Sequence, residues 1–114
     1  MTSARFRRMA LALNDTLESA HMGHPDFRVN GRIFATLHAD MQFGMVSLTP
    51  EQQQEFMSRD SAFAPENGAW GRQGSTRVTL AEVDEEILGE ALTVARRNAI
   101  EKGPPGTRRS KPKR

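Results

Sequence analysis

The dipeptide Asn30-Gly31 constrains the fold of this chain more than any other feature of its sequence. It lies between two apolar runs, and a type I′ hairpin turn needs positive φ at both central residues, which asparagine and glycine tolerate best. A two-residue turn here predicts three cross-strand pairs: Val29 with Arg32, Arg28 with Ile33, and Phe27 with Phe34. The aromatic pair is expected to fix the register of the two strands.

Periodicity and capping signals place further elements on both sides of this hairpin. They predict a helix over 3–14, strands over 17–22, 43–48 and 75–80, a helix from Thr49-Pro50 to about Asp60, a loop over 64–74, and a long helix capped by Asp84. The order is therefore helix, strands, helix, strand, helix. It predicts a two-layer α+β domain, in which an antiparallel sheet of about five strands carries helices packed on one face.

The length and the absence of cysteine limit the classes of protein that the chain can belong to. At 114 residues it supports one domain, expected over 1–102, and the stretch 103–114 is too poor in apolar residues to order itself. Zero cysteines exclude disulfide scaffolds, thiolate zinc sites and thiol catalysis. Without an apolar run of membrane length or a signal-peptide pattern, we expect a cytoplasmic protein that does not enter a membrane.

The positive charge of the chain is concentrated at its ends. The formal net charge is +2, but residues 1–102 hold 11 basic and 14 acidic side chains. The last stretch contains no acid and carries five cations beyond Lys102: Arg108, Arg109, Lys111, Lys113 and Arg114. A run of this kind is expected to attract polyanions without sequence preference. The alternative is a tail that only keeps the protein soluble.

Several short motifs, in their order and spacing, resemble those of the MmcQ/YjbR family of small bacterial proteins. They are His24-Pro25-x-Phe27-Arg28-Val29, Gly31-Arg32-x-Phe34-Ala35, Val46-Ser47-Leu48, Pro50-Glu51 and Gly68-Ala69-Trp70, and the likeness covers roughly residues 4–100. The resemblance implies a two-layer α/β fold similar to CyaY and to secretion chaperones. It also implies DNA binding through a proposed double-wing arrangement. Arg32 stands where the family commonly has lysine, which keeps the charge but changes its geometry.

The first functional hypothesis is binding of DNA or another polyanion. Arg28 and Arg32 flank the hairpin turn, and Arg72 and Arg77 flank the glycines of the 71–74 loop. Arginines at hairpin and loop tips can follow a phosphate backbone, and the tail supplies further cations. The alternative is that these arginines only make an antiparallel sheet soluble.

Trp70, the only tryptophan, has two interpretations. Its ring can anchor the long loop to the sheet by burial, or it can stack on an unpaired base.

The second hypothesis is a protein-interaction or chaperone-like adaptor that uses the sheet face left open by the helices. Ile33, Ala35, Leu37 and Met45 are candidates for that face, which would hold a partner segment or a second copy. The alternative is that these residues belong to the core, because a one-residue shift in register moves them to the other face.

No pattern in the sequence indicates an enzyme, a cofactor or a metal site. His21 and His24 are three residues apart, with His38 and Asp40 further on, and two imidazoles without a third ligand make a weak site. The serines lack a G-x-S-x-G elbow and a base with an orienting partner. We therefore expect a non-enzymatic protein without a cofactor.

Overall fold

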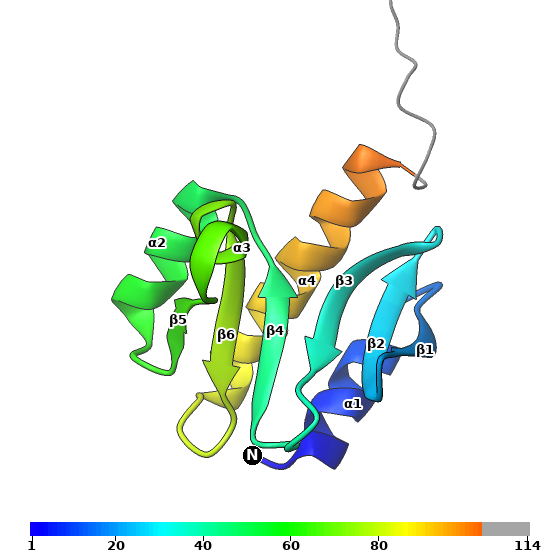
Figure 1. The fold of residues 1–114 in the computed structure, drawn as a ribbon, viewed down its shortest axis with the longest axis horizontal. Helices are drawn as coiled ribbons and strands as arrows, with labels where there is room; N and C mark the ends of the chain where they lie inside the picture. Colours follow the sequence, from blue (N-terminus) through cyan, green and yellow to red (C-terminus); the bar gives the residue numbers. More distant parts are fainter. Residues whose placement is uncertain (104–114) are drawn as a thin grey trace, which may run out of the picture.

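One antiparallel sheet of six strands organises the fold (Figure 1). The computed structural model describes residues 1–103, apart from the side chain of His21. The elements follow in the order α1 (Ser3–Leu11), β1 (Leu17–His21), β2 (His24–Val29), β3 (Arg32–Leu37), β4 (Phe43–Ser47), α2 (Pro50–Arg59), β5 (Phe63–Pro65), α3 (Gly68–Arg72), β6 (Ser75–Thr79) and α4 (Glu85–Lys102). The strand order is β1-β2-β3-β4-β6-β5, and every neighbouring pair is antiparallel. The α+β prediction is confirmed, with six strands in place of about five.

The hairpin turn forms as the sequence predicts, but its register changes beyond the second pair. Asn30 and Gly31 have φ values of 54° and 79°, and the pairs Val29–Arg32 and Arg28–Ile33 are present. The predicted pairing of Phe27 with Phe34 is wrong, because a β-bulge lies at this point and Phe27 pairs with Ala35. Phe34 is the extra residue of the bulge.

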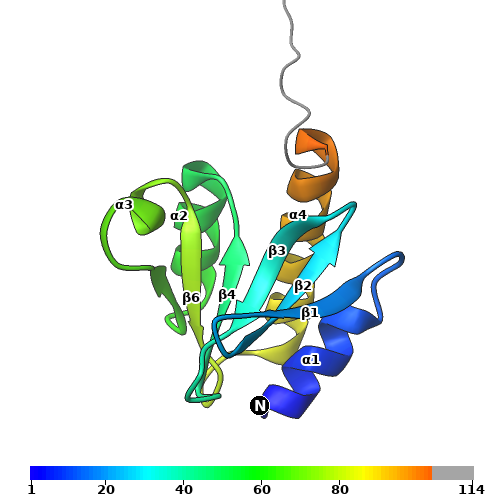
Figure 2. The same cartoon turned by 45° about the vertical axis from the view of Figure 1, so that its right-hand side comes forward.

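The core lies between the sheet and three of the helices. Figure 2 shows α2 and α4 behind the strands and α1 below β1, and α4 contacts β2, β3 and β4. Apolar residues of alternate strand positions are buried against the apolar stripe of α4 and against Phe6 of α1. The ring centroids of Phe6 and Phe27 are 6.0 Å apart. Gly44 leaves room for Phe6, since a Cβ at this position would lie 2.6 Å from the Phe6 ring.

The helix starts follow the predicted caps. Thr49 and Gln52 form a capping box at the start of α2, with Pro50 in its first turn. The carboxylate of Asp84 accepts hydrogen bonds from the backbone N–H groups of Glu86 and Ile87 at the start of α4. The first helix ends at Leu11, three residues before the predicted end at residue 14. Each satisfied cap removes unpaired backbone donors that would otherwise destabilise the helix terminus.

The stretch predicted as a loop over 64–74 contains two short elements. β5 adds a sixth strand at the edge of the sheet, beside β6, and Pro65 is tolerated there because an edge strand has unpaired positions. α3 is a five-residue helix with glycine at its first position. Neither is long enough to show a helical or alternating pattern in the sequence.

No helix of the described residues has the length and apolar character needed to span a bilayer.

Candidate functional site

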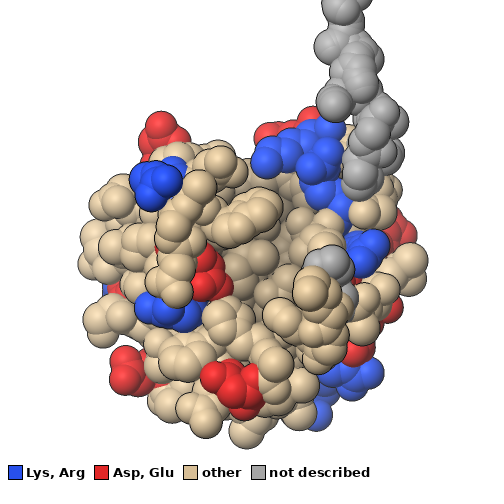
Figure 3. All heavy atoms as spheres, in the orientation of Figure 1, with Lys and Arg blue, Asp and Glu red and all other residues tan. Residues whose placement is uncertain are grey.

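The face of the sheet opposite α1, α2 and α4 is hollowed near its centre. Figure 3 looks onto this face and shows the hollow, with basic side chains gathered on the side nearest the end of α4. A cavity of about 600 Å³ lies between β3, β4, β6 and α3, and its lining is mainly apolar. Its residues include Ile33, Met45 and Trp70, together with Thr36, Ser75 and Asn67. We call this cavity the apolar hollow; its volume is within the range of small-molecule sites.

A second, smaller cavity of about 220 Å³ continues from the apolar hollow toward the end of α4. The two cavities share Ile33, Ser47, Trp70 and Ser75, so they form one groove. The second cavity adds two cations, Arg32 and Lys102, and the amides of Gln73 and Asn98. We call it the basic hollow. A ligand could place its apolar part in the apolar hollow and its anionic group beside the cations of the basic hollow.

Trp70 is the one aromatic side chain among the four residues that line both hollows. It is carried by α3, and 70% of its surface is exposed. The interpretation of Trp70 as a buried anchor for the loop is therefore wrong, because that role requires the ring to be buried. An aromatic ring of this size exposed beside a groove is a platform for a flat ligand, because tryptophan offers a large apolar face.

Gln53 fixes α3 in place from the helical side of the molecule. It belongs to α2, is buried, and its Nε2 lies 3.1 Å from each of three acceptors: the carbonyls of Gly71 and Ser75 and the hydroxyl of Thr76. Glycine is required at position 71, because a Cβ there would lie 1.8 Å from the carbonyl oxygen of Glu66. The chain therefore folds tightly between Glu66 and Gly71, and this turn sets the position of Trp70.

A histidine and a glutamate close the other end of the apolar hollow. His38 Nε2 lies 2.8 Å from Glu66 Oε2, and the two side chains are 32% and 16% exposed. Because a carboxylate only accepts, Nε2 carries the hydrogen of this bond. The ring of His38 also packs against Phe43, at 5.8 Å between centroids. The pair joins the end of β3 to the segment that precedes α3.

Three of the four arginines predicted on the folded domain, Arg28, Arg32 and Arg77, have separate partners within the protein. Arg28 donates two hydrogen bonds to Asp26, at 2.9 and 3.1 Å, and Asp26 is fully buried. These hydrogen bonds and the carboxylate charge raise the pKa of Arg28 further above its ordinary value. Arg77 lies over the ring of Phe43, at 5.6 Å. Arg72 is exposed at the end of α3.

Arg32 alone of the four borders the groove. Its Nε donates a 2.8 Å hydrogen bond to the carbonyl of Gly103, which follows α4. The remaining predicted cations, Arg108, Arg109, Lys111, Lys113 and Arg114, lie outside the described residues.

The apolar set predicted for the open face is divided between the two faces. Ile33 and Met45 line the apolar hollow, whereas Ala35 and Leu37 are buried against the helices. The bulge at Phe34 is the physical reason, since it inserts one residue between Ile33 and Ala35 and so reverses the alternation.

Among the described side chains, no three histidine, aspartate or glutamate groups come together to hold a metal ion.

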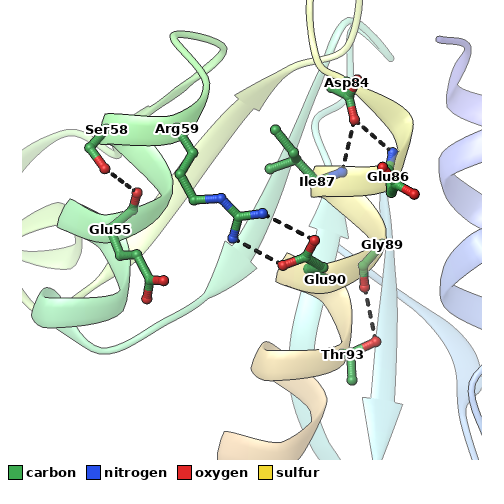
Figure 4. Close-up of polar contacts among 9 residues, drawn as sticks. All are labelled: Glu55, Ser58, Arg59, Asp84, Glu86, Ile87, Gly89, Glu90 and Thr93. Carbon is green, nitrogen blue, oxygen red and sulfur yellow. Dashed lines mark hydrogen bonds and ion pairs between the residues drawn. The ribbon is translucent and has the colours of Figure 1, made fainter.

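The helical face carries charges that are engaged in the fold itself. Figure 4 shows Arg59 of α2 and Glu90 of α4, whose ion pair joins the two helices with two N···O distances of 3.0 Å. In the same view Asp84 caps α4, and Thr93 donates to the carbonyl of Gly89. The groove on the opposite face is therefore the candidate functional site.

Comparison with known proteins identifies the family. A model of the YjbR family matches residues 11–98, which include His38, Glu66 and Trp70. The chain belongs to the YjbR family. Its fold is similar to the crystal structure of Deinococcus radiodurans protein DR2400, a domain of the DUF419 family model, with a TM-score of 0.69 and 22% identity over 98% of this chain and 83% of that chain. At this identity the likeness concerns the fold. No curated protein matches the sequence.

Sequence reasoning named Ile33, Met45, Arg32 and Trp70, but it missed Gln53 and the pairing of His38 with Glu66. Gln53 lies three residues before Phe56, on the buried stripe of its helix, and a polar residue at such a position is a signal for a buried hydrogen-bond network. His38 and Glu66 are 28 residues apart, and only the fold brings them together. No local pattern in the sequence predicts that pair.

Proposed function

We propose that the groove binds an unpaired stretch of nucleic acid, without catalysing a reaction. A base stacks on Trp70, and the adjoining phosphate lies at Arg32 and Lys102. The observation that carries this proposal is the position of Trp70, which is exposed and borders both the apolar and the basic hollow. Sites for single-stranded nucleic acid combine an aromatic platform with nearby cations in this way.

An unpaired strand suits the groove better than a duplex. Bases in a duplex are stacked on one another and are not free to lie on a side chain. Two of the four arginines predicted to contact a phosphate backbone lie outside the groove and have partners of their own, Arg28 with Asp26 and Arg77 with Phe43. The five cations between Arg108 and Arg114 remain predicted contributors to non-specific, salt-sensitive attraction.

The chain offers a direct spectroscopic test, because Trp70 is its only tryptophan and it contains no tyrosine. A short oligothymidine, a duplex of the same length and inorganic polyphosphate are titrated into the full-length protein at two salt concentrations. We expect oligothymidine to quench the Trp70 fluorescence, with an affinity that falls as salt rises. Polyphosphate has no bases and is expected to bind without comparable quenching.

Two variants separate the folded site from the tail. Replacing all five cations between Arg108 and Arg114 by glutamine should weaken binding of labelled oligothymidine while the quenching at saturation persists. Trp70→Ala should lower the affinity, measured by fluorescence anisotropy, on the order of ten-fold. Loss of all binding in the glutamine variant, or no effect of Trp70→Ala, would show that the groove is not the site.

A second candidate function is the capture of an apolar side chain of a partner protein. The specific observation in its favour is the apolar lining of the larger hollow, with Ile33 and Met45. A partner of this kind would bind with little dependence on salt, because its contacts are not ionic. If oligothymidine quenches Trp70 and its affinity falls as the salt concentration rises, capture of an apolar side chain is excluded as the main use of the groove.

A further inference from the structure

The carboxylate of Glu66 places hydrogen-bond acceptors in the apolar hollow. It is the one carboxylate among the described residues that line either hollow. His38 occupies one of its acceptor positions, at Oε2. A carboxylate has about four lone-pair positions, so Oε1 and part of Oε2 remain for a ligand. A polar group that meets Glu66 inside the apolar hollow must therefore donate hydrogen bonds.

Only one of the four DNA bases presents two adjacent donors on its Watson–Crick edge. Guanine offers N1–H beside its N2 amino group, which matches the two oxygens of a carboxylate. Adenine and cytosine place a ring acceptor beside their amino donor, and thymine places its single N–H between two carbonyls. An acceptor facing the Glu66 carboxylate would be left unpaired in a partly buried site, which is costly.

We propose that the apolar hollow is a guanine-selective base pocket, with Glu66 reading the N1–H and N2 amino donors. Asn67 lines the same hollow and its amide can donate to the O6 carbonyl of guanine. Trp70 provides the stacking surface, and Arg32 and Lys102 in the basic hollow receive the phosphate. This inference rests on the proposed binding of an unpaired strand and specifies which base the groove prefers.

The distribution of charge along the groove supports a guanine nucleotide over a cationic ligand. The acceptor Glu66 stands at one end and the cations Arg32 and Lys102 at the other, with Trp70 bordering both cavities. A guanine nucleotide has donors on its base and negative charge on its phosphate, in the same order. A lysine or arginine side chain from a partner would satisfy Glu66 but would bring further positive charge toward the basic rim.

His38 acts as a positioning residue for Glu66. Its Nε2–H holds Oε2, and its ring is packed against Phe43, so the carboxylate is restrained from two elements of the fold. Loss of this bond should loosen Glu66 and reduce the discrimination between bases, with little change in stacking on Trp70. His38→Gln retains a donor and should preserve more of the guanine preference than His38→Leu.

The test uses oligothymidine strands of one length that differ at a single central base: guanine, inosine, adenine or thymine. Inosine keeps N1–H and lacks the amino group of guanine, so it measures the contribution of that group. Affinities of the full-length protein are obtained from quenching of Trp70. We expect guanine to bind on the order of ten-fold more tightly than adenine or thymine, with inosine between them.

Glu66→Gln is the decisive variant, because it preserves the shape of the side chain and replaces one acceptor oxygen by a donor. It should remove the preference for guanine by lowering the affinity for the guanine strand and raising the affinity for plain oligothymidine, because the new amide N–H can donate to a thymine carbonyl. Glu86→Gln, an exposed position on α4, is the matched control and should change neither. Equal affinities for the four strands, or a guanine preference that survives Glu66→Gln, would overturn the base pocket while the proposed strand binding stands. If no strand quenches Trp70, both proposals fail.

Discussion

The two faces of the same sheet follow different physical rules. On the covered face, alternate strand residues are buried against α1, α2 and α4, and the lining is almost wholly apolar. On the open face, the strands present Ile33 and Met45 among threonine, serine and arginine, and only α3 partly closes it. Burial of apolar area on the covered face stabilises the fold. The open face instead carries half-buried side chains arranged around a groove. Stability and binding should therefore be separable by mutation.

The sharpest test of this separation compares two adjacent residues of β3. Phe34→Ala removes a ring that is fully buried on the covered face, and we expect a loss of about 3–5 kcal/mol of unfolding free energy. Ile33→Ala removes a half-buried side chain that lines the groove, and should cost roughly 1 kcal/mol while weakening oligonucleotide binding. Urea unfolding and Trp70 quenching measure the two effects. Equal losses of stability would contradict the division between faces.

Gln53 is the residue at which the two faces are coupled. Gln53→Leu leaves the carbonyls of Gly71 and Ser75 without this donor, and we expect a loss of about 1–3 kcal/mol. Because the same bonds hold α3, quenching of Trp70 by oligothymidine should weaken even under conditions where the variant is fully folded. Gln54→Leu changes the exposed neighbour and should leave both quantities unaltered.

The arginines of the open face should differ in what they contribute. Arg28→Gln removes the partner of the buried Asp26, so it should lower the urea midpoint more than Arg77→Gln, whose side chain lies over Phe43. Asp26→Asn in the Arg28→Gln background should recover part of that loss, because the uncompensated carboxylate is gone. A large decrease in oligonucleotide affinity for Arg28→Gln, without a change in stability, would instead assign this arginine to the binding site.

The smallest effect is expected on the helical face. Hydrogen bonds from Arg59 lower the pKa of Glu90, so the contribution of this pair is present above the ordinary glutamate pKa of about 4.3 and is lost as the pH falls through the lower folded-state value. Arg59→Gln should therefore change the urea midpoint slightly at neutral pH, and the difference from the parent protein should disappear in acid. Binding of oligothymidine should not change at all.

Local signals in the sequence predicted most of the sheet and the helix starts. The turn at Asn30-Gly31, the capping box at Thr49 and the cap at Asp84 each rest on neighbouring residues, and all three are present. The bulge at Phe34 was not predictable in the same way, because it depends on how the hairpin packs against α4. Because the prediction lacked this bulge, it assigned Ala35 and Leu37 to the open face, whereas both are buried against the helices.

The groove was less accessible to sequence reasoning than the fold. β5 and α3 are too short to give a periodic signal, and the groove exists only because α3 rises beside the sheet. The pairs that shape it, Gln53 with Gly71 and His38 with Glu66, join residues 18 and 28 positions apart. The family resemblance, by contrast, was carried by local motifs, and the match to the YjbR family over 11–98 confirms it.

The most direct test of the open face as the binding surface is a pair of ¹H–¹⁵N correlation spectra of the full-length protein, without and with the oligothymidine that contains one guanine. The single indole N–H of Trp70 gives one isolated signal. We predict that this signal and the backbone amides of α3 and of the groove-facing residues of β3, β4 and β6 shift most, while those of α2 and the start of α4 stay in place. Shifts confined to the helical face, or to residues 104–114, would contradict the assignment of binding to the groove.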